Sequence, residues 1–352
     1  MARQGQPSVR PGCWLFILLT SVLLLGLASG HIRLPAGVRD GVARQSERIL
    51  GPSHTRGLFE PGDGAKVTGP ALDEAALDEI RAALLKAIND DRMVAGLPPV
   101  ILDDDLTRLG NAHCREMVRG RFASHWTPDG LKPYHRYSLA GGSGHHEQNV
   151  AWRRDSRGYG DAERALADCL DSHAQMMAER PPNDGHRRTI LSGKVDRVGV
   201  GLAAEGEYLA FTHEFASDAV RFLEPMSRRA DPKGRVKVAV EVPAGHELSM
   251  VVLRRERPPE PLTGTQLMAR GSYGYEGEDV LHLRPMLEPG WHYSDGSRGE
   301  LERRGSVYSG EFAMPSARGL YTLLAGVDGE VRAALTLVSP GSLVDESRYQ
   351  WP

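Results

Sequence analysis

The chain has 352 residues, 40% of them hydrophobic and 25% charged, which is the composition of a globular protein and enough length for two domains. Its formal net charge of −3 provides no basic surface, so composition gives no support to a nucleic-acid partner. Arginine greatly outnumbers lysine, a bias typical of GC-rich bacterial genomes.

The first thirty residues have the three parts of an export signal. Arg3 and Arg10 precede the apolar run Cys13–Ala28, and two small residues follow it. This run is shorter than the roughly 20 residues that a membrane-spanning helix needs. We therefore expect residues 1–30 to be a signal peptide, with an uncleaved N-terminal membrane anchor as the alternative. In both cases the rest of the chain is expected to be secreted, periplasmic or otherwise extracytoplasmic.

The following segments carry linker, helix and strand signals in turn. Residues 31–70 contain Pro, Gly, Arg and His without periodicity, which predicts a linker. Apolar residues three and four positions apart then predict three helices, and alternating apolar and polar residues predict two antiparallel strands. The helices are expected at Leu72 to near Gly96, after Leu102 to Gly120, and Asp161 to about Glu179, and the strands at Val195–Gly201 and Glu207–Phe215.

A change of pattern near residue 220 predicts two domains. Helices and strands share residues 71–220, which predicts an α+β layered domain. Over residues 232–340, strand-like runs separated by turn residues predict a smaller all-β domain, a sandwich or barrel of unknown role without a catalytic constellation. Its expected strands are Arg235–Val242, Leu248–Leu253, Gly319–Ala325 and Val331–Val338.

The chain has too few cysteines for a disulfide framework. Cys13 lies in the predicted export segment, which leaves Cys114 and Cys169 for the mature protein. An oxidising compartment would allow these two to pair. Both also lie in helical patterns beside small or apolar residues, so two separate core thiols are the open alternative.

A series of motifs in the predicted α+β domain carries a family resemblance. The motifs are Ile88–Val100, Leu102–Leu106, Ser124–Gly130, Glu147–Ala151, Gly185–Leu191, Val198–Gly201 and Ala210–Phe215. In this order they resemble the CAP superfamily domain, also called the SCP domain. That superfamily takes in cysteine-rich secretory proteins, antigen 5 of venoms, plant pathogenesis-related proteins and many bacterial exported proteins. The resemblance implies a three-layer α-β-α sandwich followed here by the all-β domain.

The resemblance also implies a central cleft that contains two histidines and two acidic residues, and that binds a divalent metal in several members. His125 and His186 stand at the positions of the two histidines, and would be the ligands of zinc or another divalent metal. A neutral imidazole nitrogen is a good zinc ligand. Two histidines alone are fewer than the three or four protein ligands that zinc normally has.

The acidic positions of this chain depart from the family pattern. The first family carboxylate directly precedes an asparagine, but here Gln148 precedes Asn149, and Glu147 lies one place earlier. Either a one-residue bulge brings Glu147 to the cleft, or the cleft has the amide of Gln148. We favour Glu147, which is then the candidate catalytic base. At the second acidic position the alignment gives Ser172, with Asp171 beside it.

Three other histidines favour structural roles. His113 lies on the apolar face of its predicted helix and is expected to be a core residue. His145 and His146 lie in a Gly-rich stretch and are expected to be exposed, with a role as extra ligands as the alternative.

Three functions are consistent with these residues. The favoured one is a non-catalytic extracytoplasmic protein that binds a small ligand, lipid, peptide, glycan or divalent metal in the histidine-lined cleft. The sequence has no Gly-x-Ser-x-Gly elbow and no cysteine with a clear catalytic environment. The alternatives are a metal-assisted, peptidase-like hydrolase, and a module for cell-envelope interactions with a vestigial cleft. The oligomeric state is not predicted.

Overall fold

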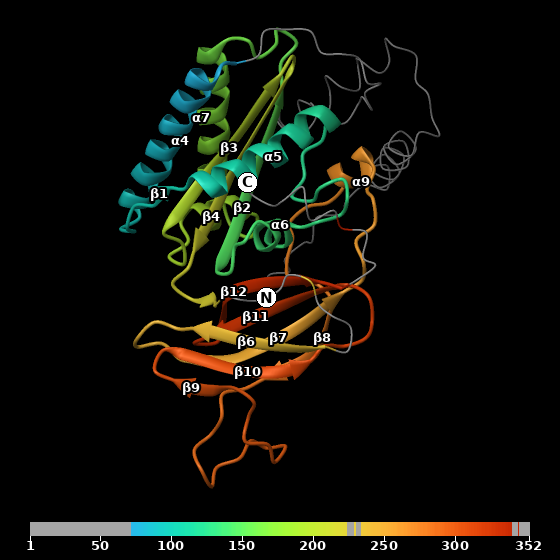
Figure 1. Ribbon diagram of the computed structural model, residues 1–352. Coiled ribbons are helices and arrows are strands. Elements are labelled where there is room, and N and C mark those ends of the chain that lie inside the picture. Colours follow the sequence, from blue (N-terminus) through green and yellow to red (C-terminus); the bar gives the residue numbers. More distant parts are fainter. Residues whose placement is uncertain (1–71, 224–228, 230–233, 340–343, 345–352) are drawn as a thin grey trace, which may run out of the picture. The chain divides into compact units, whose positions relative to one another are not determined.

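The computed structural model describes residues 72–223, 229, 234–339 and 344, so the predicted export segment and linker lie outside the described residues. Within these ranges, no helix combines the length and apolarity that crossing a membrane requires. The described chain contains three four-stranded sheets, one in its N-terminal half and two in its C-terminal half (Figure 1).

The first sheet has a central strand that is buried throughout. Its order is β1-β3-β4-β2, in which β1 pairs with β3 in parallel and the other pairs are antiparallel. All ten residues of β4 are buried, because helices cover both faces of the sheet. The strands are β1 (Ile101–Leu102), β2 (His145–Arg154), β3 (Arg197–Glu205) and β4 (Tyr208–Ser217).

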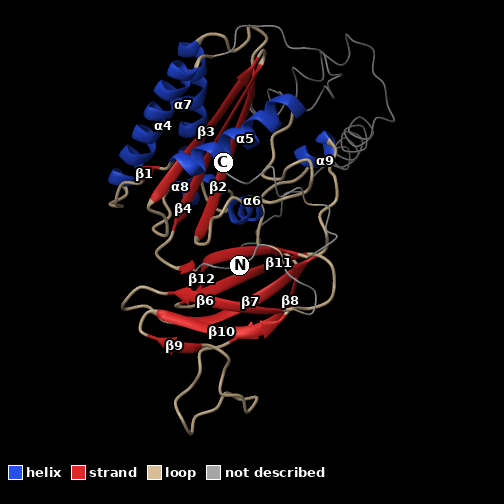
Figure 2. Cartoon of the chain, in the orientation of Figure 1, coloured by secondary structure: helices blue, strands red, loops and turns tan. Residues whose placement is uncertain are grey.

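Helices form the layers on either side of this sheet (Figure 2). Helices α4 (Glu74–Val94) and α7 (Ala162–Ala178) pack against each other and against one face. Helix α5 (Asp104–Gly120) crosses the other face. Two short helices, α6 (Pro133–Leu139) and α8 (Gly185–Ile190), complete this part. The predicted α-β-α arrangement is confirmed, as are the three long helices and the antiparallel pair β3–β4.

Helix α5 approaches β3 closely because both carry a glycine at the contact. The Asp103 side chain accepts a hydrogen bond from the backbone N–H of Leu106 and so caps the start of the helix. One turn further, a Cβ added at Gly110 would stand 2.7 Å from the Cα of Gly201. Any side chain at either position would push the helix off the strand.

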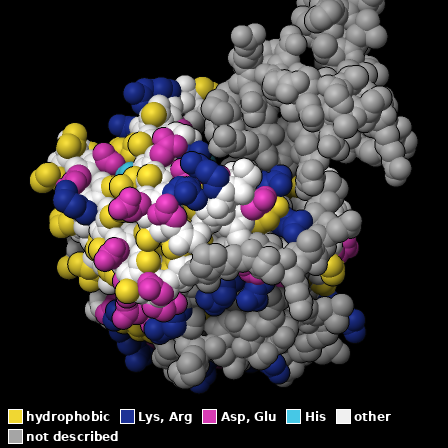
Figure 3. Space-filling model, turned by 90° about the horizontal axis from the view of Figure 1, so that it is seen from above, with side chains coloured by type: hydrophobic (Ala, Val, Ile, Leu, Met, Phe, Trp, Pro, Cys, Tyr) yellow, Lys and Arg dark blue, Asp and Glu magenta, His cyan; other side chains and the backbone are white. Residues whose placement is uncertain are grey.

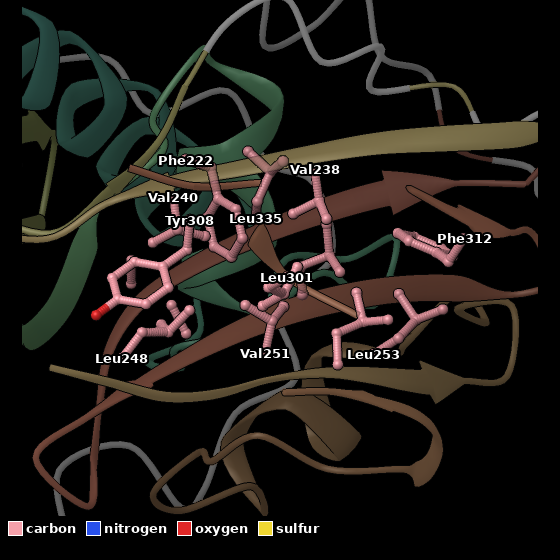
Figure 4. Packing of buried hydrophobic residues seen from close by; sticks show 14 of the residues in the cluster. Phe222, Val238, Val240, Leu248, Val251, Leu253, Leu301, Tyr308, Phe312 and Leu335 are labelled. Atoms are coloured by element: carbon pink, nitrogen blue, oxygen red, sulfur yellow. The ribbon is translucent and has the colours of Figure 1, made fainter. Parts of the chain in front are cut away.

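The C-terminal half contains two sheets with a shared apolar core. Their orders are β5-β6-β10-β9 and β12-β11-β7-β8. Apolar side chains of both sheets form one buried cluster, which includes Phe222, Val238 and Val240 from the first and Val251 and Leu253 from the second (Figure 4). The strands are β5 (Arg221–Phe222), β6 (Arg235–Glu241), β7 (Leu248–Glu256), β8 (Glu278–Leu283), β9 (Glu302–Arg304), β10 (Val307–Ala313), β11 (Leu320–Val327) and β12 (Glu330–Val338).

This arrangement agrees with the β-rich region expected from the sequence, and it adds one short helix, α9 (Gly264–Met268), between β7 and β8. Helix α6 packs on β12, where the Ser138 hydroxyl accepts a hydrogen bond from the backbone N–H of Thr336. Figure 3 shows acidic and basic side chains mixed with hydrophobic ones on the visible face, in keeping with the small net charge.

The two cysteines among the described residues are separate core thiols. Cys114 belongs to the apolar cluster between α5 and the sheet, and Cys169 to the cluster on the opposite face. Both are free and fully buried, and burial raises the pKa of each thiol. Of the two alternatives left open by the sequence, the structure has the unpaired one.

Candidate functional site

The candidate site lies around β2, which forms one edge of the first sheet. Successive side chains of a strand point to opposite faces. Gln148 lies opposite Glu214 of β4, on the face that α5 covers, whereas Asn149 lies opposite His213, on the face that α7 and α8 cover. Adjacent residues of one strand thus reach two different layers, and we call the group around them the edge site.

On the α5 face, four polar side chains form a continuous hydrogen-bonded chain. His125 Nδ1 lies 2.9 Å from Gln148 Oε1, and Gln148 Nε2 donates to Glu214 Oε1 over 2.7 Å. The other carboxylate oxygen of Glu214 lies 3.0 Å from His146 Nε2. The ring of Tyr137 stacks on His146 at 4.7 Å between centroids. Gln148, Glu214 and His146 are all buried.

These contacts set the protonation states of the hydrogen-bonded side chains. Burial alone would raise the pKa of Glu214, but the hydrogen bonds from His146 and Gln148 and the nearby charge of Arg136 lower its pKa to about 2. Burial lowers the pKa of His125 to about 4, and the charge of His186 acts in the same direction. Near neutral pH, Glu214 is therefore ionised and His125 is neutral.

On the other face, His186 is held by a carboxylate. Its Nδ1 lies 2.5 Å from Glu179 Oε1, and its backbone N–H donates to Glu179 Oε2 over 3.0 Å. The Asn149 side chain donates to the backbone carbonyl of His186 over 3.0 Å, which fastens α8 to β2. Glu179 was not among the residues predicted from the sequence. The available signal was its place at the end of the third helix, seven positions before His186.

Among the described residues, neither of the predicted acidic residues is hydrogen-bonded to either of the two histidines. The pairing of β2 with β4 runs from His145 to Arg154 without a register shift, so no bulge turns Glu147 towards His125. Glu147 Oε1 instead lies 3.1 Å from His145 Nε2. It is Gln148 that contacts His125, as the second alternative stated.

The second acidic position also lies elsewhere. Asp171 forms an ion pair with Arg153 at 2.7 Å, and the Ser172 hydroxyl donates to the backbone carbonyl of Asp168. Neither side chain is hydrogen-bonded to His125 or His186, and the carboxylate that contacts His186 is that of Glu179.

The outcome for the three other histidines is mixed. His113 is 1% exposed, and its Nε2 lies 2.8 Å from the backbone oxygen of Ser124, so the predicted core role is confirmed. The expected exposure of His145 and His146 is wrong, because both are buried. They begin β2 and lie between the sheet and its covering elements, whereas the Gly-rich stretch before them had indicated a loop.

A further histidine, His213, lies in the core of the α7 face. Its side chain is 0% exposed and stands between the rings of Phe211 and Phe215. The ring of His173 is 5.5 Å away and is itself bonded to Asp91 at 2.8 Å. Neither ring nitrogen of His213 has a hydrogen-bond partner among the described residues. Burial, with the charges of His173 and His186, keeps the pKa of His213 well below its usual value.

Acidification is expected to destabilise the protein through His213. The unfolded chain takes up a proton at this residue near pH 6.5, and the folded chain does not. The free energy of unfolding should therefore fall as pH drops below about 6.5, by up to about 1.4 kcal/mol per pH unit for this histidine. In urea unfolding between pH 7.5 and 5, His213→Leu should have a shallower slope than the wild type, and replacing the exposed His292 with Leu should leave the slope unchanged. Equal slopes for all three proteins would contradict the assignment.

A segment from the β-rich half covers the His125 side of the edge site. The connection from β7 to β8 contains Tyr273, whose ring is 4.8 Å from that of His125. The Tyr273 hydroxyl accepts a hydrogen bond from the backbone N–H of Gln148 over 2.8 Å. It thereby satisfies a main-chain donor on an edge strand, where such donors are otherwise unpaired. We call residues 257–277 the cover segment.

Apolar contacts and an ion-pair cluster hold the cover segment in place. Leu262 and Leu267 belong to the same apolar cluster as Trp126, over which Arg270 lies at 5.2 Å. At the start of the segment, Glu256 binds the side chains of three residues of the N-terminal half: Lys132, Tyr134 and His135. No site residue was predicted in this half from the sequence, because no local pattern connects Tyr273 with His125.

The metal implied by the family resemblance has few ligands here. Among the residues that the structure describes, no three His, Cys, Asp or Glu side chains stand together as a metal-binding group. His125 and His186 each have Nδ1 engaged by an acceptor, which leaves one nitrogen apiece. Two nitrogens are fewer than zinc normally takes from a protein. A metal therefore stays a prediction from the sequence.

The α-β-α layers define a three-layer sandwich protein. At the sheet edge it has a polar site beside β2, with His125 on one face and His186 on the other. Residues 85–215 match the family model of the cysteine-rich secretory protein family, CAP. These residues therefore form a CAP-family domain, as the motifs of this region had indicated. Among curated proteins, none matches it in sequence.

Three solved structures are similar to this one at low identity. An outer surface protein of Borrelia burgdorferi is 16% identical, with 43% of this chain and 98% of that chain covered, at a TM-score of 0.35. An extracellular SCP-domain protein of Bacillus anthracis is 15% identical, with 42% and 44% covered, at 0.32. A cysteine-rich secretory protein of Staphylococcus aureus is 18% identical, with 39% of each chain covered, at 0.24.

Proposed function

We propose that the protein is an extracytoplasmic binding protein, and that the edge site holds a small polar ligand without transforming it. One observation carries the proposal: on both sides of β2 an acceptor engages Nδ1 of a histidine, Gln148 at His125 and Glu179 at His186. A ring fixed in this way presents Nε2 to a ligand. The export-type pattern of the first thirty residues supports the location outside the cytoplasm.

The chemistry of the surrounding residues favours binding over covalent catalysis. A nucleophilic cysteine needs a lowered pKa and access to substrate. Cys114 and Cys169 are fully buried, and burial raises the pKa of each. Glu147, the candidate base, faces away from His125 and lies against His145. These features support a role in which the two histidines hold a ligand in place.

Direct binding measurements test this proposal. The chain from residue 31 onward is titrated by calorimetry with an N-acetylglucosamine tetramer, a pentapeptide pool and phosphatidylglycerol vesicles. We expect one of these probes to bind the wild type, and the affinity to fall at least tenfold in a His125→Ala/His186→Ala variant. The exposed His246→Ala is the matched control and should bind like the wild type. Binding that survives in the double variant, or no binding of any probe, would overturn the proposal.

A metal-assisted hydrolase is the second candidate, because two imidazole nitrogens flank the same strand edge. The same proteins distinguish it from a binding protein. Metal content after incubation with Zn²⁺, and mass spectrometry of the peptide pool, are the readouts. Stoichiometric Zn²⁺ that is lost in the double variant, together with cleaved peptides, would establish the hydrolase and remove the binding proposal.

A further inference from the structure

The orientation of the Gln148 amide is fixed by its neighbour Glu214. An ionised carboxylate can only accept hydrogen bonds, so the atom that faces it over 2.7 Å has to be the amide nitrogen Nε2. Turning the amide round would bring its oxygen against the carboxylate. The amide oxygen Oε1 therefore points to His125.

The amide oxygen of Gln148 in turn determines which nitrogen of His125 carries the hydrogen. Oε1 of an amide is an acceptor only, so His125 Nδ1, 2.9 Å away, has to carry the hydrogen. A neutral imidazole has one protonated nitrogen, and Nε2 is then the one with the free lone pair. His146 holds the far end, because its Nε2 lies 3.0 Å from the second oxygen of Glu214 and its ring is stacked on Tyr137.

We propose that Glu214 is a positioning residue that acts through Gln148 to hold His125 in the Nδ1–H tautomer, so that this end of the edge site binds a hydrogen-bond donor. Ligand groups of this kind are sugar hydroxyls, amide N–H groups and ammonium groups. An ionised carboxylate or a phosphodiester has only acceptors and would face the lone pair of Nε2. The inference rests on the proposed binding role, and it narrows the ligand class for that role.

Burial and charge both support the role of Glu214 and Gln148. Glu214 is 0% exposed and Gln148 is 3% exposed, so water competes little for their hydrogen bonds. The amide also solves a charge problem at this position. A glutamate in place of Gln148 would stand directly opposite Glu214 on the neighbouring strand, and two like charges there would repel each other. The amide of Gln148 instead donates to Glu214 through Nε2 and accepts from His125 through Oε1, and it adds no charge.

Nitrogen-15 spectra of the histidine rings at pH 7 test the tautomer directly. In the wild type, two-bond proton–nitrogen correlations should show His125 with a protonated Nδ1 and an unprotonated Nε2. In Glu214→Gln the facing group can donate or accept, so Gln148 is free to turn and His125 should shift towards the Nε2–H form. Glu214→Asp should restore the wild-type pattern. Glu147→Gln, on the opposite face of the same strand, should leave it unchanged.

A second variant covers the case in which Glu214→Gln does not fold. Gln148→Leu removes the acceptor itself and should shift His125 to the Nε2–H form while Glu214 keeps its bond to His146. A wild-type His125 with Nε2 protonated, or an unchanged Nδ1–H signal in folded Gln148→Leu, would overturn the inference. The readout needs no ligand. If His125 has the expected tautomer but the protein binds none of the probes, the proposed binding function is contradicted. The inference that Glu214 and Gln148 set the tautomer of His125 would still hold.

Discussion

Replacing Arg92 with leucine is expected to lower the free energy of unfolding by about 4 kcal/mol. The guanidinium group is 0% exposed and donates to the backbone carbonyls of Pro98, Ile190, Ser192 and Val195 over 2.9 to 3.3 Å. Each orphaned buried carbonyl costs about 1–3 kcal/mol, and part of this cost returns as the segments relax. Urea unfolding followed by circular dichroism measures the loss.

The same substitution is expected to loosen the edge site. Three of the four carbonyls belong to the end of α8 and the residues after it, so Arg92 fixes the helix that carries His186. Arg188→Leu is the matched control, because that side chain is 71% exposed and pairs only with the nearby Asp184 among the described residues. A loss below 1 kcal/mol in Arg92→Leu would show that the four carbonyls find other donors.

Replacing Glu256 with alanine is expected to lower the free energy of unfolding by about 3 kcal/mol and to uncover His125. The Glu256 carboxylate accepts from Tyr134 at 2.7 Å and from His135 at 3.0 Å, and it pairs with Lys132, which is only 3% exposed. Without it, Lys132 has the largely exposed Glu276 as its remaining ion-pair partner among the described residues. Breaking a buried ion pair on one side leaves an uncompensated charge.

Two measurements check this result. Carbethoxylation by diethyl pyrocarbonate, mapped by mass spectrometry, should be several-fold faster at His125 in Glu256→Ala than in the wild type. Glu278→Ala, which removes an exposed carboxylate near the same strand, should react like the wild type. Burial raises the pKa of Glu256, but His135 and Lys132 lower it to about 2. The contribution of Glu256 to stability is therefore complete only above about pH 5, beyond the pKa of an unfolded glutamate, and is lost as pH falls towards about 2.

The elements predicted correctly from the sequence are those that carry their own periodicity. Helices α4, α5 and α7 each turn one apolar stripe towards the sheet, and β3 and β4 are joined by a short turn, so local pattern was sufficient. Strand β2 was missed for a physical reason. Polar side chains lie on both faces of this strand, so apolar and polar residues do not alternate along it. Gln148 belongs to the hydrogen-bonded group on one face, and Asn149 binds α8 on the other.

The site was predicted only in part, since its supporting residues come from distant positions. The family motifs indicated His125 and His186, and the structure gives each an acceptor at Nδ1. Which residue lies behind Gln148 depends on the register of β2 with β4, which a single strand does not encode. Tyr273 comes from a connection in the β-rich half, and only tertiary packing brings it to His125.

The glycine contact between α5 and β3 has a consequence for how this protein can diverge. Gly110 and Gly201 fix the distance between helix and strand with backbone alone. From the same helix, His113 holds the carbonyl of Ser124, the residue directly before His125. The orientation of the His125 ring thus depends on two positions that have no side chain to vary. Residues that touch a ligand are free to change during evolution and retune specificity, whereas a single methyl group at the glycine pair would misdirect the whole site.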